Sequence, residues 1–152
     1  MDKVLETGLI DVLATYKQRK ARLAQEKNER EYKEAEFLSQ FYVHCKKVIE
    51  PAFEEFKKIV KELGDIECRI EKHPPTDSIT IAFLISDVGP GQASLSEYPH
   101  LTISCDKHNC ILSVHKYNRI EDGPAETGLG LEEVNEEYLH SRLLELLNEE
   151  LS

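Results

Sequence analysis

The first 50 residues contain no proline and a single glycine, Gly8. A stretch so rich in helix formers and so poor in helix breakers predicts one long helix, or two helices nearly end to end. Its middle, residues 17–36, is almost entirely charged or polar, and a helix that is polar on every side has no face to bury in a core of its own. We therefore expect residues 1–36 to form a projecting helical arm and residues 37–152 to form a folded domain.

The arm carries an apolar seam near its N-terminus. Four apolar residues between Leu5 and Tyr16 follow a 4-3-4 spacing, which is typical of a short coiled coil. The seam continues at Leu23 and then fades, because charged residues take the next positions. We expect it to mediate dimerisation or the docking of a partner protein. The residues expected to take part are Leu5, Leu9, Val12, Leu13 and Tyr16, with the basic residues Lys17, Arg19, Lys20 and Arg22 beside them.

A second, wider apolar stripe begins at Phe37 and resumes after Pro51. Proline lacks a backbone donor and usually kinks or restarts a helix, so a break is expected there. Gly64 is expected to end the helix. This stripe is the face against which a sheet would pack.

Four segments with the alternating pattern of strands follow. In the first hairpin we expect Ile70 to lie opposite Ile79. In the second, a tight turn at Lys107-His108 would set Cys105 opposite Cys110. The four segments are 66–72, 79–85, 100–105 and 110–117.

The last helix is expected to begin near Asn135, a favourable N-cap residue. The order is then a long N-terminal helix that could act as a coiled-coil arm, a four-stranded antiparallel meander, and a C-terminal helix packed on the sheet. This order predicts an α+β fold of two layers. The glutamates of the last helix are interpreted as a solvated face.

Two long segments, 86–99 and 118–131, are expected to be loops that meet at one edge of the sheet. Long loops without structure of their own are often functional, although simple connections around the sheet explain them as well. If the domain binds a ligand, this edge is the first place to expect it. The residues of this candidate binding edge are Gly89, Gly91, Gln92, Gly123, Gly128 and Gly130.

The cysteines and histidines give weak signals for chemistry. Cys105 and Cys110 are interpreted as core thiols, with a redox-linked disulfide or a metal site as less favoured alternatives, because zinc sites usually bring a second pair of ligands. His100 and His115 could face each other across a strand pair, but their sequence neighbours suggest no third ligand. We expect no metal and no cofactor.

The charge of the chain is unevenly distributed. The formal net charge is −10, and residues 64–152 contain 6 Lys/Arg against 17 Asp/Glu. An acidic folded domain repels phosphate backbones, so we expect no nucleic-acid partner. No apolar run approaches the ~18 residues of a membrane span, and the N-terminus lacks the layout of a signal peptide. A cytoplasmic protein without a membrane partner is expected.

These observations favour a non-enzymatic, self-associating interaction or adaptor protein, whose arm pairs with another copy, as a dimer, or with another protein. The basic residues of the arm are interpreted as a solvated face, or as a dock for an acidic surface such as the C-terminal segment of another subunit. The alternative function is a small-molecule or peptide-binding domain with its site between loops 86–99 and 118–131. An enzyme would need a perturbed acid, base or thiol in a cleft.

Overall fold

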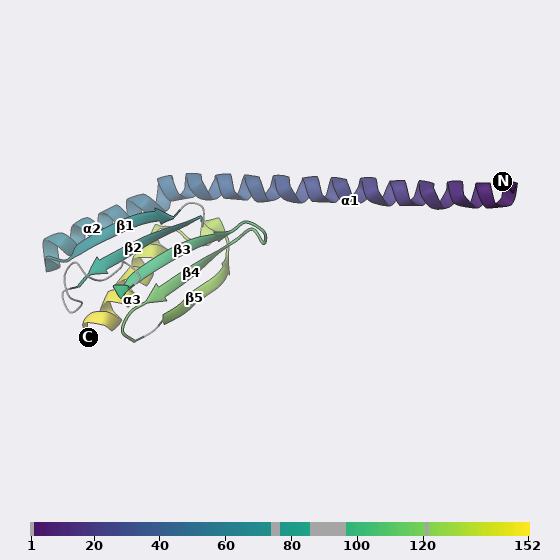
Figure 1. Cartoon of the computed structure of the whole chain (residues 1–152). Coiled ribbons are helices and arrows are strands. Elements are labelled where there is room, and N and C mark those ends of the chain that lie inside the picture. The colour runs from purple at the N-terminus through teal and green to yellow at the C-terminus, as the bar shows by residue number, and fades with distance from the viewer. Residues whose placement is uncertain (1, 74–76, 86–96, 121) are drawn as a thin grey trace. The chain divides into compact units, whose positions relative to one another are not determined.

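The computed structural model describes residues 2–73, 77–85, 97–120 and 122–152 (Figure 1). The chain separates into two compact units, Met1–Glu36 and Phe37–Ser152. Within the first unit, residues 3–36 belong to the helix α1 (Lys3–His44), which confirms the long N-terminal helix. Among the described residues, no helix combines the length and the apolar character needed to cross a membrane.

The second unit is an antiparallel sheet with helices packed on one of its faces, so the α+β class is confirmed (Figure 1). The strands lie in the sheet in the order in which they occur in the chain. Their bounds are β1 (Glu67–His73), β2 (Ser78–Leu84), β3 (His100–Asp106), β4 (Ile111–Tyr117) and β5 (Asp122–Leu129).

The sheet has five strands, so the prediction of four is wrong. β5 occupies most of the segment 118–131 that was expected to be a loop. Glycine and Pro124 are unfavourable in strands, which is why the sequence pattern predicts a loop here. Proline is nevertheless tolerated on an edge strand, where one row of backbone groups needs no partner. The pairing with β4 is interrupted by register shifts near Val114, and Gly128 takes the left-handed conformation there (φ 76°). This is the local geometry of a β-bulge.

Both predicted hairpin registers are wrong by two residues. Ile70 pairs with Ile81 rather than Ile79. Cys105 pairs with Leu112 because the turn spans residues 107–110 and leaves Cys110 outside the strand, in the left-handed conformation (φ 53°). A shift of two residues returns every paired side chain to the same face of the sheet, so the predicted inward faces hold within the strands while the predicted partners do not. Cys110 is the exception, because the sequence pattern predicts a core thiol there and the side chain is exposed.

The helix does not break at Pro51. A π-helical turn, η1 (Cys45–Ile49), joins α1 to α2 (Glu50–Gly64), and the Glu50 N–H donates to Cys45 O. A proline in an α-helix leaves one carbonyl without its donor and clashes with the preceding turn. The wider turn just before Pro51 accommodates both effects, so the helix continues.

The π turn also keeps the apolar stripe on one side. Phe41, Cys45, Ile49 and Phe53 recur every four residues, and all are buried. In an α-helix each residue turns the chain by about 100°, so residues four apart differ in direction by roughly 40°. Over the three intervals from Phe41 to Phe53 the side chains would therefore rotate away from the core. One extra residue in the wide turn cancels most of that rotation. All four side chains therefore reach the same core.

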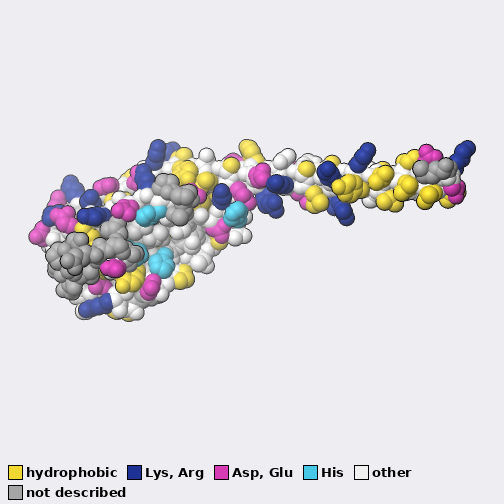
Figure 2. All heavy atoms as spheres, in the orientation of Figure 1, with side chains coloured by type: hydrophobic (Ala, Val, Ile, Leu, Met, Phe, Trp, Pro, Cys, Tyr) yellow, Lys and Arg dark blue, Asp and Glu magenta, His cyan; other side chains and the backbone are white. Residues whose placement is uncertain are grey.

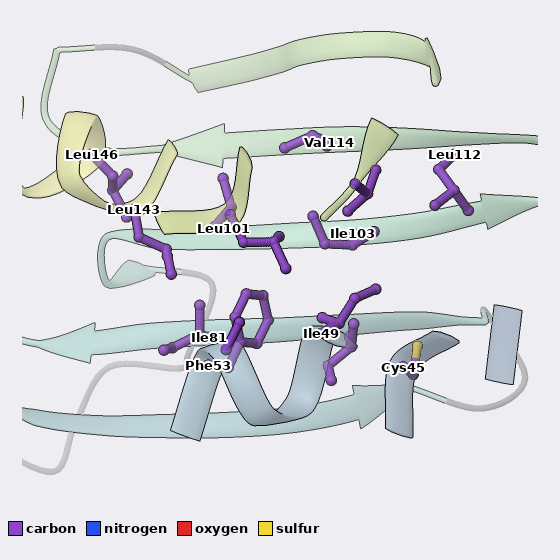
Figure 3. Packing of buried hydrophobic residues seen from close by; sticks show 14 of the residues in the cluster. Cys45, Ile49, Phe53, Ile81, Leu101, Ile103, Leu112, Val114, Leu143 and Leu146 are labelled. Atoms are coloured by element: carbon purple, nitrogen blue, oxygen red, sulfur yellow. The ribbon is translucent and has the colours of Figure 1, made fainter. Parts of the chain in front are cut away.

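The core lies between the helices and the inward face of the sheet (Figure 3). Phe53 of α2 and Ile81 of β2 belong to this buried cluster. Leu143 of the last helix, α3 (Glu136–Leu151), and Leu101 of β3 belong to it as well. All four side chains are fully buried. The short helix η3 (Leu131–Glu133) leads from β5 towards α3.

The N-cap of α3 is confirmed, because Asn135 Oδ1 accepts a hydrogen bond from the Tyr138 N–H at 2.8 Å. The glutamates of α3 are more than a solvated face. Lys116 of β4 is buried, and its Nζ lies 3.0 Å from both Glu145 Oε1 and Glu149 Oε2. Its charge would be costly in a core without these partners, so the two carboxylates hold α3 to β4.

We expect Phe53→Ala to lower the free energy of unfolding of the α+β unit by about 3–5 kcal/mol, because it removes a fully buried ring. Leu63→Ala is the matched control on the same helix. Leu63 is 85% exposed, so its loss should change stability by no more than about 0.5 kcal/mol. Urea denaturation followed by the near-ultraviolet circular dichroism of the tyrosines measures both, and equal effects would contradict the packing described.

Candidate functional site

The apolar seam of the arm is exposed along its whole length. The exposed fractions range from 45% at Leu9 to 65% at Val12. At about 100° per residue, the residues at positions 5, 9, 12 and 16 lie within about 60° of one another around the helix, and Leu13 lies next to them. Figure 2 shows hydrophobic side chains gathered on the N-terminal part of the arm. Soluble proteins rarely leave such a row of large apolar side chains without a partner.

Local interactions keep the arm helical. Asp2 Oδ1 accepts a hydrogen bond from the Val4 N–H at 3.0 Å, which caps the first turn. Further along, Lys27 pairs with Glu31 one turn away at 3.9 Å. Each such pair stabilises the helix by only about 0.2–0.5 kcal/mol, so the helix depends on many small local interactions. The seam is consequently not used to hold the arm in its helical form.

The four basic residues of the predicted interaction site are also exposed, and they follow the seam directly. Around the helix they point in different directions, so they do not form one basic face. Arg19 and Lys20 border the seam, whereas Lys17 and Arg22 lie away from it. Their role in binding stays a prediction.

The candidate binding edge is described only in part. Gly89, Gly91 and Gln92 lie outside the described residues. Gly123 lies near the start of β5, whereas Gly128 lies near its end and Gly130 follows the strand. At about 3.3 Å per residue, Gly123 and Gly128 are some 16 Å apart. These three glycines therefore line an edge strand rather than gather at one corner of the sheet.

A cleft of about 300 Å³ opens elsewhere in the α+β unit, between the end of α1, η1 and the β1–β2 hairpin. The Tyr42 hydroxyl donates to Asp77 Oδ1 at 2.5 Å, and this hydrogen bond raises the pKa of Tyr42 to about 12. Lys72 forms an ion pair with Glu50 beside it. Sequence reasoning missed this cleft because only the fold joins residues 42 and 77. Its apolar lining residues are Phe41, Cys45 and Ile79.

The two histidines are neighbours, but they are not directly opposite. His100 pairs with Tyr117, and its ring stacks on the His115 ring at a centroid distance of 6.0 Å. His100 Nδ1 lies 2.7 Å from Tyr98 O, and burial lowers the pKa of His100. His115 Nε2 lies 3.1 Å from Asp122 Oδ1. Asp122 belongs to β5, which is why the sequence offered no carboxylate here.

One group of side chains in the described residues could hold a metal ion. Glu55 of α2 approaches Glu136 and His140 of α3, and their ligand atoms all lie within 4.8 Å of one another. Glu136 and His140 are four residues apart in α3 and so lie on one face of the helix. This spacing was the signal for the cluster in the sequence. Both carboxylates are exposed, and His140 Nε2 lies 3.8 Å from Glu55 Oε2. Exposed acidic groups often lie together without a metal, so this cluster alone does not indicate a metal site.

All four cysteines are free thiols. Cys45 and Cys68 are buried, Cys105 is half-buried, and Cys110 is exposed in the turn after β3. Burial raises the pKa of Cys45 and Cys105 to about 12 and that of Cys68 to about 11. A thiolate is therefore scarce at these three positions at neutral pH, which argues against nucleophilic chemistry there.

The chain matches no family model, no curated protein and no solved structure.

At pH 8 we expect a thiol reagent to modify Cys110 quickly and the other three cysteines slowly, since a buried thiol with a raised pKa offers little thiolate. The change of absorbance with time measures both phases. Cys110→Ser should remove the fast phase, and unfolding in urea should make all remaining thiols react. Fast reaction of two or more thiols in the native protein would contradict the burial described.

Proposed function

We propose that this chain is a non-enzymatic interaction protein that self-associates through the seam of its arm, with a second copy of the chain as the occupant. Pairing two arms brings two α+β units into one dimer. Each unit is then available as an adaptor surface for another protein. The observation that carries the proposal is the exposed row of apolar side chains from Leu5 to Tyr16.

The energetics favour pairing. Full burial of a large apolar side chain is worth about 1.5–3 kcal/mol, and the seam residues are about half exposed. The arm is already helical through local interactions, so pairing has to order little backbone. The ordering cost that opposes many helix-in-groove interactions is therefore small here.

A second arm suits the seam better than an acidic surface does. Residues 1–36 contain eight Lys/Arg and eight Asp/Glu, so the arm is neutral and two arms carry no net repulsion. The C-terminal segment of another subunit is a weaker candidate for the basic residues. Its Glu145 and Glu149 already pair with Lys116, and Glu150 accepts from the Arg119 N–H at 2.8 Å.

The cleft beside Tyr42 favours a second candidate function, the binding of a small apolar molecule with one polar group. Its volume of about 300 Å³ is at the lower end for ligand sites, and Tyr42, Asp77 and Lys72 supply convergent polar atoms. This location differs from the predicted site between loops 86–99 and 118–131, which stays a prediction.

Chemical-shift mapping with a fragment library tests ligand binding in the cleft. Shifts at Tyr42 and Asp77 support the cleft, and their absence argues against it.

Leu9→Lys is expected to weaken self-association at least ten-fold, about 1.4 kcal/mol, because it sets a charge into the paired seam. Ile10→Lys is the matched control. Ile10 is exposed and adjacent in the chain, but it points away from the seam, so its substitution should change the association constant less than about two-fold. Sedimentation equilibrium of the full-length variants measures both constants.

Far-ultraviolet circular dichroism should show equal helix content in both variants, because leucine, isoleucine and lysine differ little in helix propensity. Equal weakening by Leu9→Lys and Ile10→Lys would contradict the seam as the interface. A wild-type protein that is monomeric at every concentration would contradict self-association itself. If that monomer bound an acidic peptide through the basic residues, the docking alternative would replace our proposal.

A further inference from the structure

We infer that the two arms pair in antiparallel orientation, with Leu5 of one copy against Leu23 of the second copy and the two-fold axis near Ala14. This inference rests on the proposed self-association and specifies its geometry. It follows from the exposed side chains of the helix Lys3–His44 and from their spacing.

The antiparallel register uses every apolar position of the seam. Coiled-coil cores are built from layers in which a residue of one helix meets a residue of the other. With the axis near Ala14, Val12 of one copy meets Tyr16 of the second copy, and Leu5 meets Leu23. By symmetry each layer occurs twice, as in any isologous interface. The overlap from Asp2 to Glu26 covers about 25 residues, or roughly 37 Å of helix.

The remaining core layer sets Leu9 against Arg19 of the second copy. An arginine at the border of a seam lays its aliphatic stem along apolar neighbours and keeps its guanidinium in water. Arg19 is exposed in the single chain. In the pair its side chain would have to reach past Leu9 so that the guanidinium stays in water. The layer therefore tolerates the one charged residue within the seam.

The flank of the same register is complementary in charge. Glu6 of one copy faces Lys20 of the second copy, and this pair occurs twice. Between the two pairs Leu13 meets Leu13 of the second copy, which extends the apolar contact across the two-fold axis. At the ends of the overlap Asp2 meets Glu26, a like-charged approach. Glu26 is already paired with Arg22 at 3.8 Å, which reduces the repulsion.

A parallel pair would bring like charges together along the arm. Arg19 would stack on Arg19 of the second copy within the core. On the flanks Arg22 would face Lys27, and Glu29 would face Glu34, because parallel coiled coils pair these positions five residues apart. Each like-charged contact is unfavourable. The antiparallel register avoids these three contacts and has one like-charged approach, between Asp2 and Glu26, at each end of the overlap.

A shorter antiparallel register, shifted by one heptad, is also less favourable. It would set Leu5 against Tyr16 of the second copy and leave Leu23 beyond the contact. It would also bring Leu13 against Glu6, so an apolar side chain would meet a carboxylate. The shorter register sets Leu9 against Val12 and Asp2 against Arg19. The register centred near Ala14 has the longer overlap, keeps Leu23 in the contact and pairs Glu6 with Lys20, and these three differences favour it.

Cysteine substitutions in the full chain distinguish these arrangements. Cys110→Ser serves as the background, because Cys110 is the exposed native thiol. In that background Leu13→Cys is expected to give a disulfide-linked dimer under mild oxidation. Leu9→Cys should not, because the two copies of residue 9 are about 15 Å apart along the helix in this register. Non-reducing electrophoresis measures the linked fraction.

A charge exchange gives an independent readout. Glu6→Lys and Lys20→Glu are each expected to weaken self-association about five-fold at low salt, because each replaces two attractive contacts with two repulsive ones. The double variant Glu6→Lys/Lys20→Glu should return to within about two-fold of the wild type. Sedimentation equilibrium of the three variants measures this recovery.

The outcomes separate the geometry from the proposed function. Linking through residue 13 together with recovery in the double variant supports the antiparallel register. Linking through residue 9 but not residue 13 overturns it, in favour of a parallel pair or of the shorter antiparallel register, and leaves self-association intact. A wild-type dimer that links through neither position also overturns the register. A wild-type monomer overturns both the register and the proposed function.

Discussion

The wide π turn at Cys45–Ile49 is the constraint on which the α+β unit depends. It lets the helix pass Pro51 without a break and keeps Phe41, Ile49 and Phe53 directed at the same core. A true break at Pro51 would have freed α2 from α1 and divided this apolar stripe in two. Because the stripe is continuous, the end of α1, η1 and α2 together cover the inward face of the sheet.

The arm, in contrast, has none of its described side chains buried in a core. Its side chains are exposed, and its helix depends on a cap, on pairs one turn apart and on residues with high helix propensity. A helix stabilised in this way does not need its apolar side chains for its own fold. The seam is consequently available for association, and this difference between the two units is the physical basis of the proposed function.

The sequence predicted the features that follow from local chemistry. The lack of breakers before Pro51 indicated the long helix, alternation indicated four of the strands, and Asn135 marked the start of α3. It also indicated which side chains of each strand face the core, because alternation determines the face. It could not determine the partner across the hairpin, since a register shifted by two residues satisfies the same alternation.

What the sequence missed depends on residues that only the fold brings together. β5 has few apolar residues, and its pairing with β4 outweighs the weak strand propensity of Gly123 and Pro124. The pattern of glutamates in α3 predicts a solvated face, whereas in the structure two of them pair with the buried Lys116 of β4. The cleft beside Tyr42 joins two segments that are distant in the sequence. Long-range contacts of this kind leave no periodic signal in the chain.

The mass of the wild-type chain in solution, measured by sedimentation equilibrium over a wide range of concentrations, tests self-association most directly. Our account predicts a monomer of 17.4 kDa at low concentration that gives way to a species of twice that mass as the concentration rises. A mass of 17.4 kDa at every concentration would contradict it.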